Sequence, residues 1–98
     1  SKDGFDKALS QGKLMMVDFW ADWCGPCRML GPVIEQLAGR YPDVVVGKVN
    51  VDDEQELALR YGVMSIPTVI FFKDGKEIDR KVGVMPPEVF TQVLDTNK

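Results

Sequence analysis

Histidine is absent from the 98-residue sequence and cysteine occurs only twice, so the chain has few of the side chains from which metal sites are built. A structural zinc site normally takes four Cys or His ligands, and this chain offers two. Half of a zinc site remains an alternative for the two cysteines, but the missing ligands argue against it. We therefore expect no metal site.

Positive charge is scarce as well, because 12 Lys and Arg residues stand against 15 Asp and Glu, for a net charge of −3. Nucleic-acid binding depends on clustered basic side chains, so no nucleic-acid partner is expected. No apolar run approaches the roughly 18 residues of a membrane-spanning helix, and residues 1–4 form no apolar signal region. Two cysteines without an export signal favour a reducing compartment, so we expect a cytoplasmic protein without membrane contact.

The apolar spacing that is present predicts a single α/β domain over residues 1–98, with a sheet between layers of helices. Strands are predicted at residues 14–20, 43–51, 68–72 and 77–82. Helices are predicted around residues 5–9, over 24–39, between the acidic pair 52–53 and residue 62, and from residues 86–87 onward. Asp52 or Asp53 would cap the third helix, and Ser1 or Asp3 the first.

The two cysteines occur in Trp23-Cys24-Gly25-Pro26-Cys27, where the first predicted strand ends and the second helix begins. Free N–H groups and the positive end of a helix dipole gather at such a place, and both favour a thiolate. A thiol there, or in a Cys-x-x-Cys pair, has its pKa lowered from about 8.5 into the range of about 3.5–7.5. A structural disulfide and inert packing are the alternatives, but this spacing favours redox chemistry.

Asp18 is the one acidic residue in the otherwise apolar first strand. An ionised carboxylate without a partner costs several kcal/mol when it is buried. Two interpretations are open: Asp18 is exposed at the end of the strand, or it is a buried acid with a raised pKa.

Residues 17–27 resemble the active-site signature of the thioredoxin family. Residues 48–52 look like the central strand of that family, and residues 61–68 like the loop that carries its cis-proline. Residues 72–75 and 81–83 resemble its hairpin and the following turn. The resemblance covers essentially the whole chain. The Gly-Pro between the cysteines is typical of the thioredoxin family. Protein disulfide isomerases usually have Gly-His there, and glutaredoxins have Pro-Tyr.

The resemblance implies a thioredoxin fold in which a mixed four-stranded sheet, without the first strand of the family, is flanked by four helices on both faces. It also implies roles for four residues. Cys24 is the nucleophile and Cys27 the resolving thiol. Asp18 lies beneath Cys27 and accepts its proton, with Lys48 as the partner of Asp18. An ordinary surface lysine is the alternative for Lys48.

The resemblance further implies a cis peptide bond before Pro67, which would leave the Ile66 backbone free to pair with an extended substrate. A proline that merely begins a strand is the alternative. The expected docking surface is flat and apolar and comprises Trp23, Gly25, Pro26, Ile66, Pro67, Val82 and Gly83. Trp23 packing only on its helix, and Gly83 serving only the turn, are the simpler interpretations. Trp20 is expected in the core.

The function that the resemblance implies is that of a general protein-disulfide reductase and electron donor to cytosolic enzymes. It would hold no bound cofactor and would be recharged by thioredoxin reductase, which uses NADPH. Peroxiredoxin, methionine sulfoxide reductase and ribonucleotide reductase would be typical clients. The alternatives are a redox-independent binding subunit or chaperone that uses the same docking face, and net oxidation or isomerisation of disulfides.

The sequence departs from the family pattern in two places, and these bear on its partners and on its self-association. Met64 stands where many bacterial members have a basic residue, which bears on the choice of partners. The family's first strand would pair with residues 44–51, and its absence places this largely β-branched strand at an edge of the sheet. The full-length protein is expected to be a monomer, and the 98-residue chain to self-associate.

Overall fold

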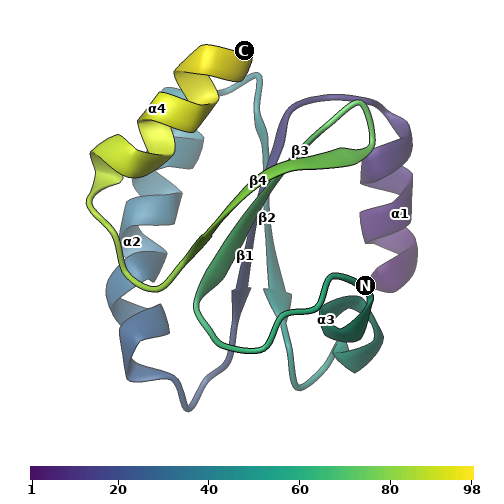
Figure 1. The fold of residues 1–98 in the computed structure, drawn as a ribbon, viewed down its shortest axis with the longest axis vertical. Helices are drawn as coiled ribbons and strands as arrows, with labels where there is room; N and C mark the ends of the chain where they lie inside the picture. The colour runs from purple at the N-terminus through teal and green to yellow at the C-terminus, as the bar shows by residue number, and fades with distance from the viewer.

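The computed structural model describes residues 1–98 and contains the eight predicted elements in the predicted order (Figure 1). The helices are α1 (Lys2–Ser10), α2 (Gly25–Arg40), α3 (Gln55–Arg60) and α4 (Pro87–Asn97). The strands are β1 (Met15–Trp20), β2 (Val45–Asn50), β3 (Thr68–Lys73) and β4 (Lys76–Val82). None of the helices combines the length and the apolar character that a membrane crossing requires.

The four strands form one mixed sheet, as the family resemblance implied, in the order β2-β1-β3-β4. β2 runs parallel to β1, which the intervening helix α2 makes possible by returning the chain to the end of the sheet at which β1 begins. β3 and β4 are antiparallel neighbours. The two residues that connect β3 to β4, Asp74 and Gly75, have φ values of 55° and 78°. Two-residue hairpin loops of type I′ require a positive φ at both positions.

Helices cover both faces of the sheet, with α2 and α4 on one side and α1 and α3 on the other (Figure 1). Successive side chains of β1 therefore enter different cores. Met16 belongs to the cluster that includes Leu30 of α2 and Phe90 of α4. Val17 belongs to the cluster that includes Phe5 of α1. This double burial explains why β1 reads as an almost continuous apolar run.

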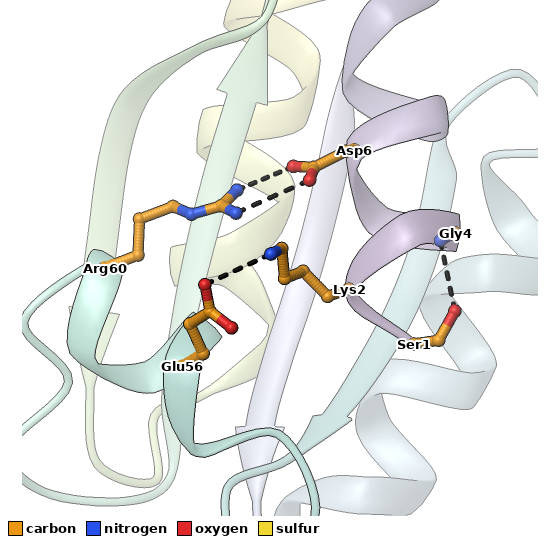
Figure 2. Close-up of polar contacts among 6 residues, drawn as sticks. All are labelled: Ser1, Lys2, Gly4, Asp6, Glu56 and Arg60. Atoms are coloured by element: carbon orange, nitrogen blue, oxygen red, sulfur yellow. Dashed lines mark hydrogen bonds and ion pairs between the residues drawn. The ribbon is translucent and has the colours of Figure 1, made fainter.

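The short helix α3 depends on its neighbours, because a single helix of six residues is not stable alone. Its Leu57 is buried in the core cluster that also includes Phe5 of α1 and Val17 of β1. Two ion pairs join α3 to α1 on the surface: Arg60 donates to both carboxylate oxygens of Asp6, and Lys2 pairs with Glu56 (Figure 2). The Arg60 hydrogen bond is the main reason that the pKa of Asp6 is lowered.

Helix capping agrees with the sequence for α1 and disagrees for α3. The hydroxyl of Ser1 accepts a hydrogen bond from the backbone N–H of Gly4, so Ser1 and not Asp3 is the cap (Figure 2). The prediction that Asp52 or Asp53 caps α3 was wrong, because the helix begins after Glu54 and no side chain caps it. Asp52 has a different partner, described below.

β2 has no neighbour on its outer side. The N–H groups of Val45 and Val51 bond inward to β1. Those of Val46 and Lys48 point outward, because donors alternate along a strand. At the other edge, β4 carries charged side chains such as Glu77 and Arg80, which discourage pairing with another strand.

We predict that the 98-residue chain self-associates with rising concentration through the bare, mainly apolar edge of β2. Sedimentation velocity should show a growing average mass. Backbone amide signals of Val46 and Lys48 should broaden with concentration, whereas those of β4 serve as the internal control and should not. A chain that stays monomeric throughout the range would contradict this prediction.

Candidate active site

The cysteine pair lies at the junction of β1 and α2, at the lower end of the molecule in Figure 1. β1 ends at Trp20, and the backbone N–H of Cys24 bonds to the carbonyl of Ala21 to close a tight turn. Cys24 is then the N-cap of α2, and its sulfur accepts the backbone N–H of Cys27 at 3.2 Å. The sequence predicted a helix N-terminus at this place. One of its N–H groups, that of Cys27, has no partner within the helix and donates to Cys24 Sγ instead.

Cys24 and Cys27 are joined in a disulfide, with their Cα atoms 5.3 Å apart. Both residues are buried, at 5% and 4% exposure. Once the disulfide is reduced, a Cys24 thiolate at this position would keep the Cys27 N–H bond and the favourable helix dipole. The Cα separation of the pair and the position of Cys24 at the helix N-terminus suit the pair to reversible exchange between a dithiol and a disulfide. No group of three or more potential metal-ligating residues occurs in the chain.

The loop before β3 lies directly against this sulfur. The Ile66–Pro67 peptide bond is cis, as expected, and the Ile66 carbonyl oxygen is 3.8 Å from Cys24 Sγ. The backbone N–H of Gly83 donates to the carbonyl of Pro67 at 2.8 Å, and Val82 is the register partner of Thr68. The structure thus brings four of the expected docking residues together, namely Ile66, Pro67, Val82 and Gly83, with Ile66 next to Cys24.

Trp23, the residue before Cys24, shares a groove with Ile66. Its side chain is 68% exposed, and its indole N–H donates to Asp52 Oδ2 at 2.9 Å. The groove has a volume of about 390 Å³ and is lined by Trp23, Val51, Val63, Met64, Ser65 and Ile66. Gly25 and Pro26 occupy the first positions of α2, with Pro26 exposed.

Sequence reasoning missed Asp52 and most of the groove. Asp52 is 29 residues from Trp23, and nothing in the local sequence signals their hydrogen bond. Trp23 and Ile66 were expected docking residues, and Met64 was noted because many bacterial members have a basic residue at its position. Met64 is 97% exposed.

Asp18 is fully buried, and neither of its carboxylate oxygens has a hydrogen-bond partner. The interpretation as an exposed residue was therefore wrong. Burial raises the pKa of Asp18 from its ordinary value of 3.8 to about 6, against a smaller lowering by the charge of Lys48. This places the proton equilibrium of Asp18 in the range where general acid–base groups work.

Lys48 is the register partner of Asp18 on β2, as expected, but the two side chains form no ion pair. The Lys48 ammonium lies over the ring of Trp20, 4.7 Å from its centroid. Asp18 lies on β1 between Met16, which shares a core cluster with Leu30, and Trp20, which packs against the cluster that contains Cys27. Asp18 therefore faces the first turn of α2.

Comparison with known proteins gives one consistent result. Residues 1–96 match the family model described as Thioredoxin. The chain is 47% identical over 95 residues to "Thioredoxin" of Chlamydia pneumoniae, covering 97% of this chain and 92% of that protein. It is 49% identical over 92 residues to "Thioredoxin" of Staphylococcus epidermidis, covering 93% and 88%. The solved structure of a mutant thioredoxin from Halobacterium salinarum NRC-1 has a TM-score of 0.92 at 37% identity, covering 99% of this chain and 85% of that chain.

We predict that Asp18→Asn raises the free energy of unfolding of the disulfide form near pH 7 by up to about 3 kcal/mol, at about 1.4 kcal/mol per pKa unit. The folded carboxyl holds its proton to higher pH than the unfolded one. The stability contributed by Asp18 is therefore full below about pH 4, falls as the pH rises towards about 6, and stays low above it.

Urea denaturation between pH 3.5 and pH 8 measures the free energy of unfolding of the parent protein and of Asp18→Asn. Plotted against pH, the two free energies should converge at the acid end, where Asp18 and its amide replacement are both neutral. A variant that is less stable at neutral pH, or a difference that does not change with pH, would contradict the assignment of a raised pKa.

Proposed function

The chain belongs to the thioredoxin family and is a dithiol–disulfide oxidoreductase, and we propose that it acts as a general protein-disulfide reductase. The observation that carries this proposal is the position of Cys24, at the N-terminus of α2 and 3.8 Å from the Ile66 carbonyl. The reactive sulfur is thus next to a backbone segment that can hold an extended client chain.

The reaction begins with the reduced Cys24–Cys27 pair. The Cys24 thiolate attacks one sulfur of a client disulfide, forms a mixed disulfide, and releases the other client sulfur as a thiolate that takes up a proton. Cys27 then loses its proton to Asp18 and attacks Cys24 Sγ. The client leaves as a dithiol, and Cys24 and Cys27 are left as a disulfide, so two electrons pass to the client. With a pKa of about 6, Asp18 can take the Cys27 proton and return it to the departing client sulfur.

Client binding follows from the surface around the sulfur. An extended segment could pair with the Ile66 backbone, as in strand addition, while apolar side chains contact Trp23 and Val82. The groove beyond Trp23 would receive a further apolar side chain, with the exposed Met64 as its rim. Because most of these contacts are backbone or apolar, they suit many different clients.

The proposal includes partners that the family resemblance implies. A flavoprotein thioredoxin reductase would restore the dithiol with electrons from NADPH, which would not itself bind this chain. Peroxiredoxin, methionine sulfoxide reductase and ribonucleotide reductase are the client types that we propose. The cytoplasm is the compartment that suits this role, because it keeps such pairs reduced.

The direct test is turnover of a protein disulfide such as that of insulin, with NADPH and a bacterial thioredoxin reductase as the electron source. We predict sustained NADPH oxidation in proportion to the concentration of the chain. The matched control, Cys24→Ser with Cys27→Ser, should give none. If the control retains the protein's biological activity, the thiols are dispensable and the redox-independent binding role replaces this proposal.

The roles of the two cysteines are separable. We predict that Cys27→Ser still attacks a client disulfide and accumulates as a mixed disulfide, because no resolving thiol remains, whereas Cys24→Ser reduces nothing. Mass spectrometry after mixing each variant with a disulfide peptide, with and without a reductant, detects the adduct. Adducts on Cys24→Ser alone would reverse the two roles.

A further inference from the structure

Trp20, the last residue of β1, contacts both the cysteine pair and the charged partner of Asp18. Its half-buried side chain packs against the cluster formed by Ala21, Cys24 and Cys27. The Lys48 ammonium lies 4.7 Å from the centroid of its ring. An indole ring attracts a cation over its face within about 6 Å, more strongly than the other aromatic side chains do.

Lys48 has two possible anchors on this face of the sheet. Asp18 is directly opposite it on β1, and Trp20 is the diagonal neighbour two residues further along. The structure shows the ammonium on the ring and both Asp18 oxygens without a partner. A direct ion pair would require the ammonium to give up its water in order to reach a fully buried carboxyl, which is costly. The ring offers attraction at the surface without that cost.

We propose that Trp20 is a positioning residue, whose ring holds the Lys48 ammonium near Asp18 but out of contact with it, so that Asp18 can both hold and release the Cys27 proton. This inference rests on the acid–base role of Asp18 in the proposed function. A direct ion pair would fix Asp18 in its ionised form. An ammonium lost to solvent would leave the buried carboxyl protonated and unable to accept a proton.

Few other charges can act on Asp18. β3 places Val69 beside it, which has no charge, and α2 contributes Cys27, which does not titrate in the disulfide form. Arg28 of α2 is exposed and donates instead to the backbone carbonyl of Asp22. Lys48 supplies the one charge that acts on the Asp18 carboxyl, and this charge lowers the pKa of Asp18 against the effect of burial. The effect of Lys48 on Asp18 therefore depends on where the Lys48 ammonium lies, and the Trp20 ring fixes that position.

The experiment is a double-mutant cycle of Trp20→Leu and Lys48→Met on the disulfide form, with the Asp18 carboxyl followed by ¹³C NMR from pH 4 to pH 9. Asp18→Asn identifies the signal. Without the ring, the exposed Lys48 side chain extends into water, so Trp20→Leu should raise the Asp18 pKa by roughly half a unit or more. In the Lys48→Met background, Trp20→Leu should add nothing to the rise that Lys48→Met already causes. Trp20→Phe keeps an aromatic face and should restore most of the parent value.

Three results would overturn the proposal. An equal rise on Trp20→Leu in the Lys48→Met background would mean that the ring acts through burial alone. A fall in the Asp18 pKa would mean that the ammonium moves closer to the carboxyl once the ring is removed, so that the ring is not what keeps it near. An unchanged pKa would mean that the ring has no such role. These titrations need no client or reductase, so their outcome is independent of whether the chain reduces protein disulfides.

A measurement on the unmodified protein covers the case in which Trp20→Leu does not fold. The ring current of Trp20 should shift the terminal methylene protons of Lys48 upfield, and Lys76 provides an exposed lysine for comparison. The shift should persist on both sides of the Asp18 titration. Terminal methylene shifts of Lys48 that match those of Lys76 would show that the ammonium is not held on the ring, and would overturn the proposal.

Discussion

The hydrogen bond from the Cys27 N–H to Cys24 Sγ is the contact on which the site depends, because it makes one cysteine of the disulfide pair the cap of α2. A cap normally needs a side-chain oxygen, and here a sulfur takes that place. The bond forms only if α2 begins immediately after the turn that follows β1. The sheet and its helices can thus be understood as the means by which this turn is held rigidly.

The surface around the sulfur is fixed by contacts from distant parts of the chain. Gly83 holds Pro67 from the end of β4, and Arg80 of the same strand donates to the Tyr61 carbonyl at 2.7 Å. α3, which leads into this loop, is anchored to α1 by the ion pairs in Figure 2. Residues far from the chemistry therefore determine where the Ile66 carbonyl lies, which is consistent with a docking surface that is formed before a client arrives.

Much of this arrangement was predictable from the sequence, because the relevant signals are local. The apolar run of β1, the helical spacing after it, and the Cys-x-x-Cys pair between them specify the junction. Asp18 was identifiable as the polar exception in an apolar strand. The sequence left open whether it is buried or exposed, and only the structure shows that it is buried. The contacts that could not be predicted join residues that the fold alone brings together. Asp52 had a local interpretation as a helix cap, but it accepts the Trp23 indole N–H instead. The stacking of Lys48 on Trp20 required the register of two strands.

The buried carboxyl of Asp18 affects both the stability of the chain and the proton transfer that we propose for it. An Asn or an apolar residue at this position would remove an unpartnered carboxyl from the core and stabilise the folded chain at neutral pH. It would also remove the carboxyl that we propose as the acceptor of the Cys27 proton. Lys48 could form an ion pair with that carboxyl only by entering the core, and its place on the Trp20 ring leaves the carboxyl without one. The loss of stability at neutral pH and the raised pKa of Asp18 therefore have one physical origin, which is the burial of a carboxyl without an ion pair.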